Sequence, residues 1–89
     1  MIETEITIIN KLGLHARAAA KLVSTAAAHS AQIRVGYPDR LVDGKSIMAV
    51  MMLAASKGTQ IVLQAEGDDA EQAIAALEDL INRRFDEGE

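Results

Sequence analysis

The sequence predicts an α+β fold in which helices cover one face of a β-sheet and the other face meets water. Segments with the two-residue apolar alternation of strands and segments with helical spacing follow one another in the order strand, helix, strand, strand, helix, strand, helix. Each longer strand segment has a single apolar face, which is typical of a sheet buried on one side. The 89 residues suffice for one domain with a modest core, so we expect residues 1–89 to form a single domain.

The first part of the chain predicts a strand and a helix. Residues 2–9 alternate as in a half-buried strand. Residues 10–13 interrupt this pattern, and residues 16–28 are strong helix formers. His29 follows, and we assign it a structural role because an imidazole beside the last helical carbonyl groups is favoured by the helix dipole. The apolar positions of this helix are Ala16, Ala19, Ala20, Val23, Ala26 and Ala27.

The middle of the chain predicts a hairpin and a short helix. Residues 31–37 alternate as a second strand, and a turn at residues 37–40 leads to a brief returning strand at residues 41–42. Ser46 is placed to cap a short helix that runs to about Leu53.

The last third of the chain predicts a strand and a long helix. Residues 59–66 alternate again, and Asp68 and Glu71 have the spacing of a capping box. We expect residues 86–89 to fray. On the strand, Ile61, Leu63 and Ala65 point inward, and Gln60, Val62 and Gln64 lie on a wet outer face. The apolar positions of the helix are Ala70, Ala73, Ile74, Leu77, Leu80 and Ile81.

The composition argues against several classes of partner and site. The net charge is −4 and the basic residues are not clustered, which argues against nucleic acid or an anionic membrane as a partner. With one Tyr and one Phe, the chain offers no platform for stacking nucleobases. The absence of cysteine excludes disulfides and thiolate metal sites. Without a signal-like segment or a long apolar span, we expect a cytoplasmic protein that does not insert into membranes.

The stretch from residue 10 to residue 20 carries the candidate chemistry. Gly13 supplies a flexible step, and His15 follows at a helix start, where unpaired N–H groups and the helix dipole favour an anion. Arg17 presents a planar fork of donors that suits phosphate oxygens. Imidazole can act as both nucleophile and proton carrier at neutral pH. These features predict a histidine that holds a phosphoryl group, whereas the plainer alternative is a histidine that only caps the helix or packs.

Two segments resemble one protein family. Residues 13–17, Gly-Leu-His-Ala-Arg, resemble the signature of the histidine-containing phosphocarrier family, HPr, of the phosphoenolpyruvate-dependent phosphotransferase system. Residues 45–48, Lys-Ser-Ile-Met, resemble the family's regulatory serine segment at the expected spacing, and the likeness covers essentially the whole chain. The resemblance implies an open-faced β-sandwich (βαββαβα), with a four-stranded antiparallel sheet and three helices on one face. Residues 1–89 would then form a single HPr-like domain.

The resemblance also implies a mechanism. Enzyme I, charged by phosphoenolpyruvate, would phosphorylate the δ1 nitrogen of His15, which would pass the group to IIA-type acceptors in sugar uptake or its regulation. The amides of Ala16 and Arg17, with the Arg17 side chain, would hold the phosphate oxygens. The chain would be a monomeric carrier without cofactor or metal, and a self-contained enzyme is disfavoured because no paired carboxylates, histidine cluster or triad accompanies His15. Ala18 departs from the proline common in the family, which leaves an extra N–H donor and a less rigid first turn.

The short helix after Ser46 is apolar on every side, so it cannot bury all of its residues. We assign Val50 and Leu53 to the core. The methionines are either flexible core fillers or, as the resemblance supports, part of a docking surface. Ser46 is an N-cap, and the resemblance adds phosphorylation by HPr kinase/phosphorylase, which would place charge in that surface and repel Enzyme I. The predicted docking residues are Ala16, Ala20, Ile47, Met48 and Met51.

Two other functions stay open at this point. A nitrogen-type regulatory phosphocarrier would use the same histidine chemistry without moving sugar. A purely binding module would leave His15 inert and would use only the apolar surface. Labelling with Enzyme I and phosphoenolpyruvate separates the binding module from both carriers.

Overall fold

The computed structural model describes residues 1–88 and contains every strand and helix that the sequence predicts. β1 and α2 end slightly earlier than predicted, and a short 3₁₀ turn, η1, ends at the first residue of the segment expected to fray. The elements are β1 (Ile2–Thr7), α1 (Ala16–Ala27), β2 (Gln32–Tyr37), β3 (Arg40–Asp43), α2 (Ile47–Met51), β4 (Gln60–Glu66), α3 (Ala70–Asn82) and η1 (Arg84–Asp86).

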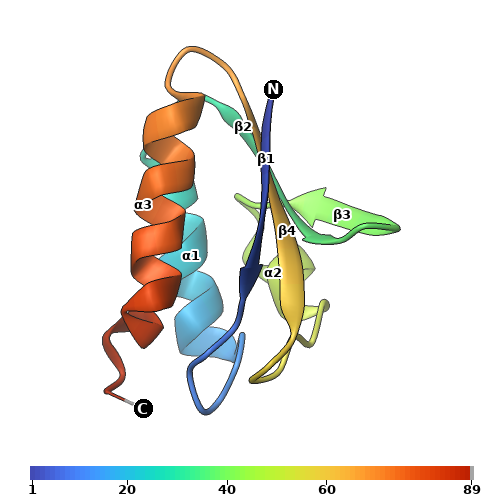
Figure 1. Ribbon diagram of the computed structural model, residues 1–89, viewed down its shortest axis with the longest axis vertical. Coiled ribbons are helices and arrows are strands. Elements are labelled where there is room, and N and C mark those ends of the chain that lie inside the picture. Colours follow the sequence, from blue (N-terminus) through green and yellow to red (C-terminus); the bar gives the residue numbers. More distant parts are fainter. Residues whose placement is uncertain (89) are drawn as a thin grey trace.

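The four strands form one antiparallel sheet in the order β1-β4-β2-β3. β4 pairs with β1 on one side and with β2 on the other, and β2 and β3 form the predicted hairpin. Figure 1 shows α1 and α3 side by side against the sheet, and α2 packs against α1 and β3. The expected open-faced sheet with three helices is therefore confirmed.

The inner strand β4 follows its predicted alternation except at one residue. Ile61, Leu63 and Ala65 are buried, as predicted. The prediction of a wet outer face is wrong for Val62, which is only 5% exposed. Val62 lies opposite Glu5 on β1 and also pairs with β2, so strands shield it on both sides, which the alternation of a single segment does not reveal.

The face of α1 that meets the core differs from the one indicated by its alanine spacing. Ala16, Ala20 and Ala27 are exposed. In a helix so rich in alanine, apolar residues occur on every side and their spacing gives little contrast. Leu22, which has far more apolar surface to bury, lies on the side that packs. The buried residues of α1 are Ala18, Ala19, Leu22 and Ala26.

α3 buries the predicted face but does not begin as predicted. Its N-cap is Asp69 rather than Asp68, and no side chain caps the helix, so the capping-box prediction is wrong. The Asp69 carboxylate instead accepts the backbone N–H groups of Ser30 at 2.9 Å and Ala31 at 2.8 Å. The bond from Ser30 is the main cause of a lowered pKa at Asp69. The buried residues are the six predicted ones, Ala70, Ala73, Ile74, Leu77, Leu80 and Ile81.

Candidate functional site

His15 is the N-cap residue of α1, with extended backbone angles of φ −72° and ψ 177°. Its Nδ1 accepts a hydrogen bond from the backbone N–H of Arg17 at 3.3 Å. The ring therefore lies against the N-terminal amides of the helix, where the sequence places it. The side chain is 28% exposed, so a visiting molecule can reach the ring.

The loop before α1 leaves His15 little freedom. Gly13 has a φ of +65°, and a Cβ at this position would lie 2.4 Å from the carbonyl oxygen of Ala55. Leu14 is buried and donates its N–H to the same oxygen at 2.8 Å. Gly13 is therefore required for a close backbone approach and a left-handed conformation, rather than for the flexibility that the sequence suggested.

Glu87, a carboxylate that the sequence analysis missed, lies beside His15. Its Oε2 is hydrogen-bonded to Nε2 of His15, although 72 residues separate the two in sequence. Its Oε1 accepts a hydrogen bond from Nδ2 of Asn10 at 3.0 Å. Partial burial favours a higher pKa for Glu87, but the hydrogen bonds from His15 and Asn10 and the charges of His15 and Lys21 outweigh it and lower the pKa. Glu87 is therefore an ionised acceptor at neutral pH.

Phe85 anchors the segment that carries Glu87. It is fully buried, and its carbonyl oxygen accepts a hydrogen bond from Nζ of Lys21 at 2.7 Å. The expectation that the chain frays from Asp86 onward is therefore wrong for Asp86 and Glu87, and Glu89 lies outside the described residues. A lone phenylalanine within a polar C-terminal segment was the signal that could have indicated that this segment packs against the core.

The backbone of this segment is strained. Arg84, Phe85 and Asp86 have φ of 56°, 53° and 61°, in the left-handed region that costs a non-glycine residue about 1–2 kcal/mol. Burial of a phenylalanine side chain contributes about 1.5–3 kcal/mol. A hydrogen bond to a charged group such as the Lys21 ammonium adds about 1.5–3 kcal/mol. The turn therefore persists because tertiary contacts offset its strain.

The two nitrogens of His15 have different partners. Nδ1 receives a backbone N–H and therefore presents a lone pair there. Nε2 faces an ionised carboxylate and therefore carries the proton of the neutral ring. These partners assign the ring to the Nε2–H tautomer, with an unprotonated Nδ1 at the helix N-terminus. Such a nitrogen is a nucleophile beside groups that bind anions.

An open hollow of about 310 Å³ lies beside this ring. Its three basic side chains outnumber its two carboxylates, so the hollow favours anions. Lys21 lies one turn after Arg17 on α1, a spacing that the sequence analysis did not use. The lining residues are Lys11, Leu12, His15, Arg17, Lys21, Asp86 and Glu87.

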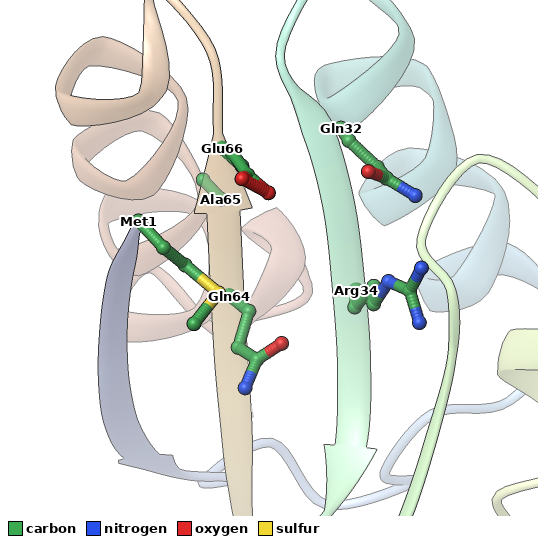
Figure 2. Close-up of a pocket in the computed structure, with 6 residues that line it drawn as sticks. All are labelled: Met1, Gln32, Arg34, Gln64, Ala65 and Glu66. Carbon is green, nitrogen blue, oxygen red and sulfur yellow. The ribbon is translucent and has the colours of Figure 1, made fainter.

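A second hollow lies on the open face of the sheet. Figure 2 shows its lining, which includes Gln32 and Arg34 on β2 and Gln64 and Glu66 on β4. Its volume of about 20 Å³ has room for little more than one water molecule. The hollow at His15 is the candidate site because it combines basic side chains with an imidazole that solvent can reach.

α2 exposes most of its apolar side chains, as the docking interpretation requires. Val50 and Leu53 are buried, as predicted. Met52 is 63% exposed and was not predicted to be part of the surface. We define the methionine patch as Ile47, Met48, Met51 and Met52, which are all exposed.

The remaining predicted residues lie at the start of α2 and on α1, which packs against α2. Ser46 is the N-cap of α2, and its Oγ accepts the N–H of Ala49 at 3.3 Å. Ala16 and Ala20 are exposed on α1, and α1 packs directly against α2. The predicted docking residues are thus carried by two helices that pack against each other.

His29 makes the structural contacts assigned to it. Its Nδ1 lies 3.0 Å from the carbonyl oxygen of Thr25 in the last turn of α1. Among residues 1–88 no three His, Cys, Asp or Glu side chains form a group that could hold a metal ion. None of the helices in this described part combines the length and hydropathy needed to cross a membrane.

An accessible imidazole at a helix N-terminus, on an open-faced sandwich, is the arrangement expected of a histidine phosphocarrier, and comparisons with known proteins establish the family. Residues 2–83 match the family model described as PTS HPr component phosphorylation site. The chain therefore belongs to the HPr phosphocarrier family of the phosphotransferase system.

Individual relatives agree with this family over nearly the full chain. The chain is 65% identical to phosphocarrier protein HPr of Pseudomonas aeruginosa over 86 residues, which are 96% of each chain. It is 38% identical to phosphocarrier protein NPr of Shewanella violacea, covering 97% of this chain and 94% of the relative. The crystal structure of HPr-C-His from Thermoanaerobacter tengcongensis superposes with a TM-score of 0.93, at 52% identity and 98% coverage of each chain.

Proposed function

We propose that this chain accepts a phosphoryl group from Enzyme I on Nδ1 of His15 and passes it to IIA-type acceptors. The observation that carries the proposal is that Nδ1 of His15 accepts the backbone N–H of Arg17 at 3.3 Å, at the N-terminus of α1, in a ring that solvent can reach. Attack by this nitrogen would leave the phosphoryl group where the amides of Ala16 and Arg17 and the helix dipole favour negative charge.

Basic side chains would complete the binding of the phosphoryl group. Arg17 is exposed, and together with Lys21 it lines the hollow beside the ring. A guanidinium can bind two phosphoryl oxygens at once, and phosphoryl transfer depends mainly on positioning and charge stabilisation. Because the site is open, donor and acceptor proteins can occupy it in turn. We place such a carrier in the cytoplasm, where phosphoenolpyruvate is available.

The methionine patch, with Ala16 and Ala20, would be the docking surface for these partners. Methionine side chains adapt to different surfaces, which suits a carrier that meets several proteins. Phosphorylation of Ser46 by HPr kinase/phosphorylase would place a dianion at the start of α2, where the helix tolerates it. The same charge would lie next to apolar docking residues and would weaken binding of Enzyme I.

Labelling tests the proposal. We expect wild-type protein incubated with Enzyme I and phosphorus-labelled phosphoenolpyruvate to gain a label that is labile in acid and stable in alkali. His15→Ala should abolish the label, whereas His29→Ala, the matched control, should retain it. A wild-type chain that gains no label from active Enzyme I would contradict the carrier and favour a purely binding module.

A nitrogen-type regulatory carrier is the second candidate function. The 38% identity to phosphocarrier protein NPr of Shewanella violacea over nearly the whole chain supports this second candidate. The chemistry at His15 would be the same, and only the partners would differ. Transfer from the labelled chain to purified sugar-type and nitrogen-type IIA proteins, compared at equal concentration, distinguishes the two.

A further inference from the structure

Glu87 touches the ring of His15 on the side opposite the nucleophilic nitrogen. One carboxylate oxygen bonds to Nε2 of His15, and the other accepts from Nδ2 of Asn10 at 3.0 Å. Asn10 is fully buried, and the same Nδ2 also donates to the carbonyl oxygen of Gly13 at 2.8 Å. The Glu87 side chain is only 13% exposed. The loop that orients His15 therefore also orients the carboxylate.

The backbone holds Glu87 in this position at a cost in strain. Three consecutive non-glycine residues, Arg84, Phe85 and Asp86, are left-handed, and burial of Phe85 fixes the turn against the core. Lys21, from the helix that His15 caps, binds the carbonyl oxygen of Phe85. Strained backbone of this kind persists where the surrounding structure determines it, and it concentrates at functional sites.

We propose, on the basis of the proposed function, that Glu87 is a positioning residue that keeps the proton on Nε2 of His15 and thereby presents Nδ1 as the nucleophile. The partner of one imidazole nitrogen decides which nitrogen carries the proton, and a carboxylate at Nε2 selects the Nε2–H form. The same carboxylate then faces the ring throughout the transfer.

The transfer step balances without moving a proton. The Arg17 N–H releases the Nδ1 lone pair, which forms the new N–P bond. The bond between phosphorus and the donor breaks, and its electron pair returns to the donor. The His15 ring keeps its Nε2 proton and becomes positively charged, and the adjacent Glu87 carboxylate stabilises this charge. When an acceptor takes the phosphoryl group, the N–P electron pair returns to Nδ1 and the neutral Nε2–H ring is restored.

His29 provides an internal contrast. Its Nδ1 lies 3.0 Å from the carbonyl oxygen of Thr25, which can only accept a hydrogen bond. His29 should therefore be the Nδ1–H tautomer, opposite to His15. These are the only two histidines in the chain, so both ring signals can be assigned with a His29→Gln variant.

Nitrogen-15 NMR of the uniformly labelled full chain, at mildly alkaline pH, tests the tautomer directly. We expect the wild-type His15 ring to be protonated at Nε2 alone. Glu87→Gln and Glu87→Ala should increase the Nδ1–H fraction about tenfold, as loss of a hydrogen bond to a charged group implies. Glu66→Gln is the matched control, because Glu66 is exposed on the open face of the sheet, and it should leave both histidine spectra unchanged (Figure 2).

A rate measurement with a small donor extends the test. Phosphoramidate, used in place of a protein partner, should phosphorylate His15 of Glu87→Gln about tenfold more slowly than wild type or Glu66→Gln. An unchanged His15 tautomer in both Glu87 variants, with the fold intact by amide NMR, would overturn the inference. A wild-type His15 ring that is protonated at Nδ1 would also overturn the inference. Absence of Enzyme I labelling would instead overturn the proposed function, and the tautomer result would still decide the role of Glu87.

Discussion

Replacing Ala54 with glycine should stabilise this protein, although glycine usually destabilises folded chains. Ala54 is exposed just after α2, with a φ of 52°. This left-handed conformation costs an L-residue about 1–2 kcal/mol and is freely available to glycine. Glycine also raises the entropy of the unfolded chain, which removes about 0.4–1 kcal/mol of the gain. The net effect is a gain of about 0.5–1 kcal/mol in the free energy of unfolding.

Urea denaturation and thermal melting measure this gain. For a domain of this size, we expect Ala54→Gly to raise Tm by about 2–8 °C. Ala75→Gly is the matched control, because Ala75 is an exposed residue inside α3. There the same chemical change should cost about 1 kcal/mol and lower Tm.

The two glycine variants must therefore move stability in opposite directions. If Ala54→Gly lowers the free energy of unfolding as much as Ala75→Gly does, the assignment of strain to Ala54 is wrong. The carbonyl of the next residue, Ala55, accepts the N–H of Leu14 in the loop before His15. Labelling of His15 by Enzyme I should nevertheless be unchanged, since glycine retains the backbone conformation.

Three further perturbations give measurable outcomes. Phe85→Ala should lower the free energy of unfolding by up to about 3–5 kcal/mol, and Phe85→Leu should lower it much less. Phe85→Ala should also free Glu87 from His15, which faster amide exchange after residue 83 would report. Equal amide protection in the two variants would contradict the anchoring role of Phe85. Ser46→Ala should cost about 1 kcal/mol in urea unfolding through loss of the cap, and Ser46→Thr should retain most of it. The pKa of Asp69 is lowered in the folded protein, mainly by the hydrogen bond from the Ser30 N–H. The ionised carboxylate therefore stabilises the fold at pH values above the unfolded-state pKa, near 3.8, and this stabilisation is lost as the pH falls through the folded-state pKa. Asp69→Asn should therefore flatten the acid limb of stability against pH, whereas Asp68→Asn should leave it parallel to wild type.

The spacing of apolar residues was sufficient to predict the buried face of a helix where apolar and polar positions differ strongly. The apolar residues of α3 recur at three- and four-residue steps and include four large ones, and all six predicted positions are buried. In α1 the contrast is weak, and the face indicated by alanine spacing was partly wrong because Ala18 and Leu22 face the core. The Asp68 cap was wrong for another reason, since Asp69 binds the distant backbone at Ser30 and Ala31 instead.

The sequence by itself determined the order of the elements, the half-buried character of the sheet and the placement of His15 and Arg17 at a helix start. These features depend on residues close together in the chain, whose spacing is visible directly. Only the tertiary structure decided that Glu87 meets Nε2 of His15, because that contact joins residues 72 apart and requires burial of Phe85 in a left-handed turn. Arg84 and Phe85 do not favour the left-handed conformation, and the turn forms because the packed core compensates its strain.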